Sequence, residues 1–169
     1  MIELKISEQG ISQIVDELGA TPAQCKKALR STLSKMARWM ETRTRKGLSA
    51  ELQIQQKIIR RRLKKSSIVA TGSGFSIKLW YGLNDVSLIH LGARETKSGV
   101  TAGRRKVEGA FIAKGQVFKR TGKSRLPIDK QVVKIQAKAN NYLDDAISQS
   151  AFDDQFFKTF EHELKWQMR

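Results

Sequence analysis

Apolar residues near the start of the chain follow two different periods. Residues 2–6 alternate between apolar and charged side chains, which predicts a short strand with one buried face. Residues 11–18 instead place apolar side chains three and four positions apart and stop at Gly19, a common residue at the end of a helix. The beginning of the chain is therefore predicted to be a strand followed by a short helix.

A longer helical pattern begins at Thr21-Pro22. A hydroxyl residue caps a helix, and proline fits its first position because that position needs no backbone N–H donor. Apolar residues then keep to one face and basic residues to the others, which predicts an amphipathic helix to about Thr42. We expect a turn around Gly47 and a second helix over residues 50–59.

Strand-like alternation replaces the helical period after residue 60. Residues 75–82 alternate clearly, and the turn-forming sequence at 71–74 precedes them, so we expect a hairpin between residues 62–70 and 75–82. Residues 86–91 are short and apolar, which predicts a buried strand. His90 lies within this segment, where a structural role is favoured over a catalytic one.

The stretch from Gly92 to Pro127 combines six glycines with many basic side chains and an apolar middle. This mixture predicts one or two extended hairpins with an apolar inner segment and basic, mobile tips. Helical spacing returns from Val132 to Ile147, breaks near residues 148–150, and continues to residue 167.

The order of helices, strands and helices predicts an α+β fold with an antiparallel sheet, a long glycine-rich basic hairpin and C-terminal helices. Its 169 residues are expected to form a single domain. Within it, residues 1–60 would be mainly helical, residues 61–127 would form the sheet and the basic hairpin, and residues 128–169 would form the C-terminal helices.

Charge narrows the functional classes. The chain has 32 Lys and Arg against 16 Asp and Glu, a net charge of +16. Most of the excess falls in two blocks: residues 26–65 carry fourteen basic and two acidic side chains, and residues 94–130 carry eleven and three. Such a balance predicts a polyanionic partner, of which nucleic acid is the commonest, or acidic neighbours in an assembly. No apolar run predicts a membrane span or a signal peptide, so a cytoplasmic origin is expected.

The candidate contacts to DNA phosphates or to a protein partner are the clustered cations of the two blocks. They are Arg60, Arg61, Arg62, Lys64, Arg104, Arg105, Lys106, Lys119, Arg120, Lys123 and Arg125. Zinc-finger spacing, an RNA-binding aromatic signature and heptads are all missing from the sequence, so contact by shape and charge without base specificity is expected.

Enzyme motifs are incomplete. Gly122-Lys123-Ser124 matches the last residues of a phosphate-binding loop, but the preceding glycine is not at the distance that the motif requires. His162-Glu163 matches the start of a zinc-protease helix, but the second histidine is missing. Glu163 with Asp153 or Asp154 faintly resembles a nuclease metal site, but we interpret these residues as solvated surface charges. A protein that is not an enzyme, without catalytic residues, metal or cofactor, is therefore predicted, and a metal nuclease is kept only as a long shot.

Four motifs together resemble the minor tail protein Z family of tailed phages and prophages. The "WxGL" strand end is Trp80–Asp85, the "GxRxTKxGV" segment is Gly92–Val100, "GAFIA" is Gly109–Ala113, and the "GKxRLPI" exit is Gly122–Ile128. The helix 21–42 and the basic segment 58–65 are also in place. One departure follows the last motif, where Asp129-Lys130-Gln131-Val132 replaces the family's frequent Gly-Pro-Ser continuation.

The resemblance implies a non-enzymatic virion protein that completes the tail near the head-tail junction. It would be made in the cytoplasm of the bacterial host, form a homo-oligomeric ring beside the DNA channel, and contact other tail or connector proteins but no membrane or small-molecule substrate. Residues 94–108 are hypothesised to be an arm that orders on a neighbouring subunit. The candidate residues for this subunit-packing arm are Arg94, Thr96, Lys97, Gly99 and Gly103. A sequence-indifferent nucleic-acid-binding protein remains the alternative.

Overall fold

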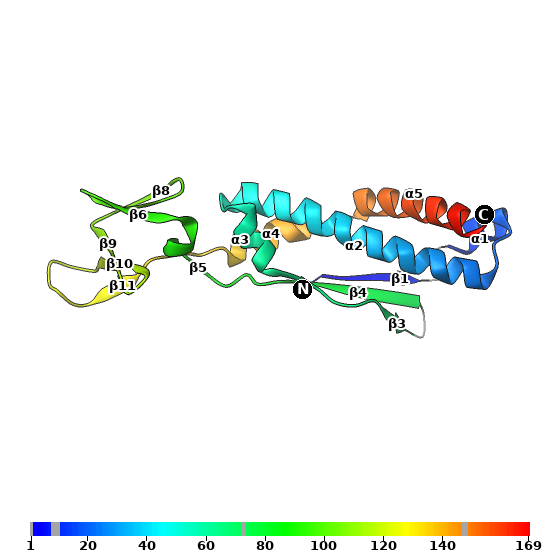
Figure 1. Cartoon of the computed structure of the whole chain (residues 1–169), viewed down its shortest axis with the longest axis horizontal. Helices are drawn as coiled ribbons and strands as arrows, with labels where there is room; N and C mark the ends of the chain where they lie inside the picture. The colour runs from blue at the N-terminus through cyan, green and yellow to red at the C-terminus, as the bar shows by residue number, and fades with distance from the viewer. Residues whose placement is uncertain (1, 8–10, 72–73, 147–148) are drawn as a thin grey trace. The chain divides into compact units, whose positions relative to one another are not determined.

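The computed structural model describes residues 2–7, 11–71, 74–146 and 149–169 (Figure 1). It contains a long N-terminal helix, several small antiparallel sheets and C-terminal helices, which confirms the predicted α+β class. The chain divides into two compact units that each combine separate stretches of sequence. Unit 1 comprises residues 1–44, 63–81 and 144–169, and unit 2 comprises residues 45–62 and 82–143.

The sheet of unit 1 is built on both sides of β4 (Gly74–Tyr81). β1 (Ile2–Ser7) pairs antiparallel with one edge of β4, while β2 (Leu63–Lys65) and β3 (Val69–Thr71) pair with the other. The predicted N-terminal strand and the hairpin of residues 62–70 with 75–82 are thus confirmed. Of the predicted turn between them, residues 72–73 lie outside the described part of the chain.

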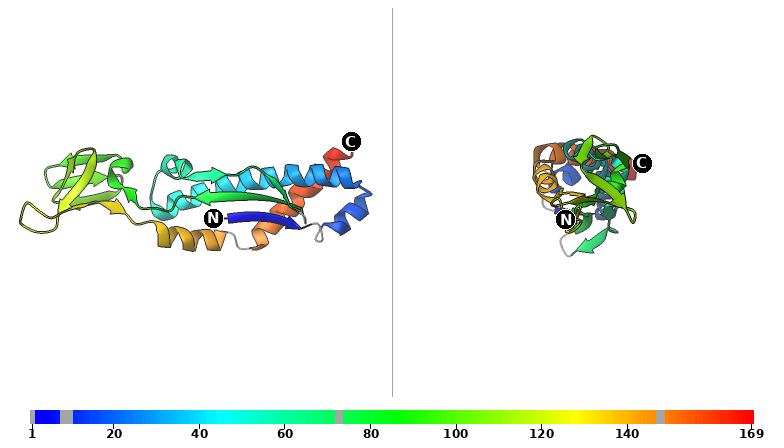
Figure 2. Two further views of the ribbon diagram at one scale, coloured as in Figure 1. Left: turned by 90° about the horizontal axis from the view of Figure 1, so that it is seen from below. Right: turned by 90° about the vertical axis from the view of Figure 1, so that its left-hand side faces the viewer.

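The main helices of unit 1 are α1 (Ser12–Leu18), the part of α2 (Pro22–Leu52) up to residue 44, and α5 (Gln149–Gln167). Of these, α2 and α5 cover one face of the sheet (Figures 1 and 2). The short helix before Gly19 and the C-terminal helix are confirmed, although the predicted positions Ile147 and Ser148 lie outside the described residues. The largest fully buried side chains of this unit are apolar: Leu29, Leu33, Met36, Met40, Leu79, Phe160 and Leu164.

The phenylalanines of α5 do not all face this core. Phe160 is fully buried and stacks on Phe156 with ring centroids 6.0 Å apart, whereas 42% of Phe157 is exposed. Phe157 therefore lies off the buried face of α5, although helical spacing alone groups it with the other phenylalanines. It lies one residue beyond Phe156, which turns it about 100° around a helix of 3.6 residues per turn.

The helix α2 is longer than the sequence predicted. Residues 42–49 are helical rather than a turn, and Gly47 lies inside the helix. Here glycine serves packing, because a Cβ added to Gly47 would lie 1.6 Å from the Tyr142 hydroxyl and 2.1 Å from its ring. The chain instead breaks after Leu52, where Gln53 adopts a left-handed φ of 51°, so the predicted helix over residues 50–59 is reduced to α3 (Gln56–Arg61).

Unit 2 contains two three-stranded antiparallel sheets in place of a long hairpin. The first comprises β6 (Ala93–Thr96), β7 (Gly99–Ala102) and β8 (Arg105–Glu108), and the second comprises β9 (Ala110–Ala113), β10 (Gln116–Arg120) and β11 (Ile128–Lys130). Strands β7 and β9 are in contact, and the backbone N–H of Ile112 donates to the Glu95 carboxylate at 2.5 Å. The core between the sheets uses small side chains, and its buried members are Val100, Ala102, Ala110 and Val117.

Gly99 allows the first of these sheets to close. Its φ of +147° lies in a region that side chains rarely adopt, and a Cβ there would approach the carbonyl oxygen of Val107 to 2.2 Å. The neighbouring turn is held by the Thr96 hydroxyl, which donates to the Gly99 carbonyl at 3.0 Å. Gly99 therefore permits close pairing with β8, while the Thr96 hydroxyl holds the turn between β6 and β7.

Short elements complete unit 2. The segment predicted as one buried strand over residues 86–91 forms β5 (Val86–Ser87) and a 3₁₀ helix, η2 (Leu88–Leu91), on which His90 is exposed. β12 (Val132–Val133) pairs with β5, so helical spacing from Val132 was the wrong interpretation. The helix α4 (Gln136–Ala146) begins four residues later.

Candidate nucleic-acid interface

Almost all the predicted contact residues belong to unit 2. Only Lys64, on β2, belongs to unit 1, where it lies opposite Trp80 in the sheet with its amine 5.8 Å from the ring centroid. The unit 2 candidates occupy three places: α3 and the residue after it, the turn into β8, and the end of β10 with the loop to β11. Their availability to a ligand differs from place to place, because some of these side chains already have hydrogen-bond partners within the fold.

Arg105 has structural partners. Its guanidinium donates to the carbonyl of Leu52 at 2.7 Å and to that of Gln53 at 3.1 Å. These carbonyls lie at the C-terminal end of α2, where the helix leaves acceptors unpaired and a cation is electrostatically favourable. Arg105 thus joins the end of α2, which lies within the first basic block, to the second block, a function that counting residues did not reveal.

Arg62 is also held by backbone carbonyls. It donates to the carbonyls of Gly82 at 3.3 Å and Asp85 at 3.2 Å, and also to that of Asn84. The Gly82 amide in turn donates to the Arg62 carbonyl at 2.8 Å. The side chain therefore fixes the loop after β4, and its donors are largely committed within the fold.

The turn between β7 and β8 exposes two further cations. Arg104 is exposed and has no ion pair among the described residues, while Lys106 lies 3.4 Å from Glu108. Both members of that pair are at least half exposed, so water and salt weaken it and Lys106 stays available. Arg104 and Lys106 are consequently the better contact candidates of this turn.

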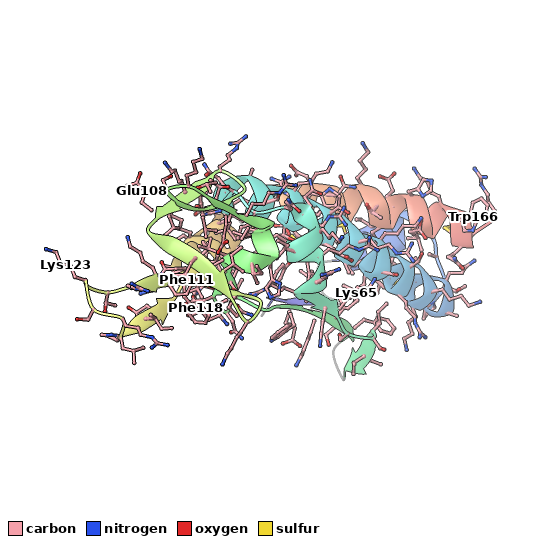
Figure 3. The ribbon with its side chains drawn as sticks, turned by 60° about the vertical axis from the view of Figure 1, so that its left-hand side comes forward. Lys65, Glu108, Phe111, Phe118, Lys123 and Trp166 are labelled. Atoms are coloured by element: carbon pink, nitrogen blue, oxygen red, sulfur yellow. The ribbon has the colours of Figure 1, made fainter. Side chains whose placement is uncertain are left out.

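The loop from β10 to β11 presents the most open positive charge. Every residue from 119 to 130 is exposed, including Lys119, Arg120, Lys123 and Arg125. The base of the loop is closed where the Thr121 amide and hydroxyl donate to the Pro127 carbonyl at 3.2 and 3.1 Å. Figure 3 shows Lys123 pointing outward from the loop, away from the strands that carry Phe111 and Phe118.

The segment predicted to be a subunit-packing arm is folded in this structure. Four of its candidates fall within β6 and β7 or the turn between them, and Gly103 lies in the next turn. Arg94, Thr96 and Lys97 are exposed, whereas Gly99 is buried. The segment has a buried face of its own, because Gly99, Val100 and Ala102 are buried and Thr101 is half-buried, so it does not need a neighbour to become regular. Its contact with a second subunit stays a prediction.

The interpretation of Glu163 as a solvated surface charge was wrong. Its carboxylate is buried, with 4% of the residue exposed, and accepts hydrogen bonds from the Ser31 hydroxyl and the Lys35 amine of α2. His162 Nδ1 lies 3.4 Å away. Burial raises the pKa of the carboxyl, but the hydrogen bonds from Lys35, Ser31 and His162 and the Lys35 charge outweigh it, so the pKa lies below its usual range.

A signal for this burial was present in the sequence. Glu163 lies seven residues after Phe156 and three after Phe160, on the same helical face as both. Its suspected partners for metal binding are elsewhere, since Asp153 and Asp154 are exposed in the first turns of α5. Across the described ranges, no three His, Cys, Asp or Glu side chains gather as a metal site.

Comparisons with known proteins identify no relative of this chain. No protein family, curated protein or solved structure matches the chain. Among the described helices, none is both long and apolar enough to cross a membrane. The resemblance to the minor tail protein Z family therefore stays a prediction based on the four motifs.

Proposed function

We propose that this chain is a structural component of a phage or prophage virion, a minor tail protein that completes the tail near the head-tail junction. In this proposal it packs in a homo-oligomeric ring beside the DNA channel and contacts tail or connector proteins. Its role is structural, without catalysis, and its positive charge faces DNA without reading the base sequence.

The observation that carries the proposal is the presentation of exposed cations by the loops of unit 2. Arg104 in the turn before β8, Lys119 and Arg120 at the end of β10, and Lys123 and Arg125 in the loop to β11 form no ion pair with any described carboxylate. Cations held apart from carboxylates suit a polyanion such as the DNA in a channel. The small sheets beneath them supply a fixed support.

The positions of the motifs add support from a second direction. Gly92 ends η2 in a left-handed conformation, Gly99 permits the approach of Val107, and the segment 109–113 includes β9. The last motif, 122–128, spans the exposed loop that leads into β11. Three of the four motifs therefore shape the sheets and loops of unit 2, while the first begins in unit 1 at Trp80 and Tyr81.

Deleting the gene from its phage or prophage tests the proposal. We expect induced cells to accumulate filled heads and separate tails, seen by electron microscopy, and a copy of the gene supplied in trans to restore joined particles. Joined, infectious particles in the deletion strain would contradict the proposal.

The alternative function, a free nucleic-acid-binding protein without sequence preference, is favoured by the same exposed cations. Titration of the purified protein with two unrelated short DNA duplexes across a salt series separates the two functions. A steep and equal loss of affinity with salt would show that the surface binds phosphates without the particle. Absence of binding at low salt would exclude the alternative and leave the virion protein.

A further inference from the structure

A basic hollow in unit 2 lies apart from the loops described above. It has a volume of about 340 Å³ and is lined by Arg45, Gln56, Lys57 and Arg60. Three of these four side chains are cations, and Arg45 and Lys57 were not among the contact residues predicted from the sequence. The volume falls near the lower end of the range of roughly 300–1,000 Å³ typical of small-ligand pockets.

The chain reversal after α2 builds this hollow. Gln53 takes a left-handed conformation, and the turn is fixed by two hydrogen bonds between Ser49 and Ile54, from the Ser49 hydroxyl at 2.6 Å and the Ile54 amide at 3.1 Å. The helix α3 follows at once. Lys57 and Arg60 lie three residues apart on α3 and therefore share one face.

The other face of α3 fixes its position. Ile59 is buried, with 5% exposed, and Ile54 before the helix is buried as well. Lys57 and Arg60 are exposed, so a ligand can reach them from solvent. The backbone around the hollow is thus held in place by buried side chains, and the cations that line it come from two helices, α2 and α3.

Arg45 carries an unused donor into this setting. Its Nε atom is buried, and no hydrogen-bond acceptor in the described part of the chain reaches it. Buried donors without an acceptor are rare in native proteins, and each one calls for an explanation. A ligand in the hollow supplies an acceptor for this atom only if the Arg45 side chain turns toward it, because the Nε atom is buried from water.

No carboxylate neutralises the three cations. The ion pairs recorded among the described residues involve other side chains, and Glu41 and Glu51 of α2 form none with Arg45, Lys57 or Arg60. Uncompensated positive charge around a hollow favours an anion. Arginine adds geometric preference, because its planar set of donors matches two oxygens of a phosphate group.

We propose that Arg45, Lys57 and Arg60 form a binding pocket for one phosphate group. Arg45 and Arg60 donate hydrogen bonds to its oxygens, with the Arg45 side chain turning so that its buried, otherwise unpaired Nε–H takes part, and Lys57 supplies a third positive charge. The phosphate belongs either to a nucleic-acid backbone or to a free phosphate-bearing ligand. The pocket goes beyond the proposed virion function and does not depend on it.

Titration of the full, ¹⁵N-labelled chain with inorganic phosphate, at constant ionic strength kept by sodium chloride, tests the pocket. We expect a saturable shift of one arginine Nε–H signal in the NMR spectrum. The Arg45→Lys variant assigns that signal by its loss while keeping the charge. No saturable shift of the Arg45 signal would overturn the proposal.

A pair of charge-matched variants separates a pocket from general screening. Lys57→Gln/Arg60→Gln removes two exposed cations, and we expect it to weaken phosphate binding by at least about tenfold, the equivalent of one charge-assisted hydrogen bond. The control Lys27→Gln/Arg30→Gln removes two exposed cations at the same spacing on α2, and its affinity should stay unchanged. Equal weakening by both pairs would overturn the proposal.

A short DNA duplex then identifies the source of the phosphate. If the duplex shifts the same Arg45 signal and inorganic phosphate competes with it, the pocket holds a backbone phosphate. If phosphate shifts the signal and the duplex does not, the pocket takes a small phosphate-bearing ligand. Either result is compatible with failure of the gene-deletion experiment, so the two proposals can fail separately.

Discussion

The two units differ in how they use charge and apolar volume. Unit 1 buries large side chains such as Phe160 and Met36 completely, and it buries one carboxylate, Glu163, against Ser31 and Lys35. Unit 2 fills the space between its small sheets with Val100, Ala102 and similar residues and leaves a long basic loop exposed. Unit 1 therefore holds a charge inside a core of large side chains, whereas unit 2 presents its charge on an exposed loop.

The largest effect is expected from the aromatic core of unit 1. Phe160→Ala removes a fully buried ring and leaves a cavity, so we expect the free energy of unfolding to fall by about 3–5 kcal/mol in urea denaturation. Phe157→Ala is the control, because this neighbour is 42% exposed and touches Phe156 edge-on. It should cost about 1 kcal/mol. Equal losses would show that the core does not distinguish the two faces of α5.

A backbone effect of intermediate size is expected in unit 2. Gly99→Ala forces a side chain onto a φ of +147°, a strain of about 1–3 kcal/mol, and also creates the contact with the Val107 carbonyl. Hydrogen exchange of the β6–β8 amides should become faster. Gly122→Ala is the control, since a Cβ there meets nothing within 4 Å. Unchanged exchange in the Gly99 variant would mean that the sheet tolerates a shifted strand.

A smaller, pH-dependent effect is expected at Glu163. Because its folded pKa is lowered, the carboxylate stabilises the fold above its unfolded pKa of about 4.5, and this contribution is lost as the pH falls through the folded pKa. Glu163→Gln should therefore cost about 1–2 kcal/mol at neutral pH and progressively less in acid. The measurement is urea denaturation at a series of pH values.

The control for this variant lies two residues earlier on the same helix. Glu161→Gln removes an exposed carboxylate that pairs with Lys165 at 2.5 Å on the surface. Water screens this pair, so its removal should leave the unfolding free energy nearly unchanged at every pH. A loss at Glu163 that does not vary with pH would show that the carboxylate charge is not what stabilises the fold.

Local patterns in the sequence predicted the elements that depend on local periodicity. The strand β1, the hairpin onto β4 and the helices α1 and α5 follow from alternation and helical spacing. The predicted turn at Gly47 failed because glycine usually interrupts a helix, whereas here its missing side chain admits the Tyr142 ring. The predicted helix from Val132 was also wrong because of a tertiary contact: Val132 pairs with Ser87 as part of a small sheet, and this pairing outweighs the helical spacing of the local sequence.

The sequence could predict which cations belong to the candidate interface, but not which of them have partners within the fold. Counting found the two basic blocks, and the structure leaves Lys119, Lys123 and their neighbours exposed as expected. Counting could not show that Arg62 and Arg105 are engaged by backbone carbonyls, since those acceptors come from residues 20 and more than 50 positions away. Which cation is free depends on tertiary contacts that no local pattern encodes.

The smallest effect on stability is expected from the loop of unit 2, where binding should change instead. Lys123→Gln/Arg125→Gln alters two exposed side chains, so the unfolding free energy should stay within about 0.5 kcal/mol. If the loop contacts DNA phosphates, the slope of the logarithm of affinity against the logarithm of salt concentration should become shallower by about 2, one for each lost contact. Lys27→Gln/Arg30→Gln removes the same charge from unit 1 and should leave the slope unchanged. Equal changes from both pairs would show that DNA responds to net charge alone and not to the exposed loop of unit 2.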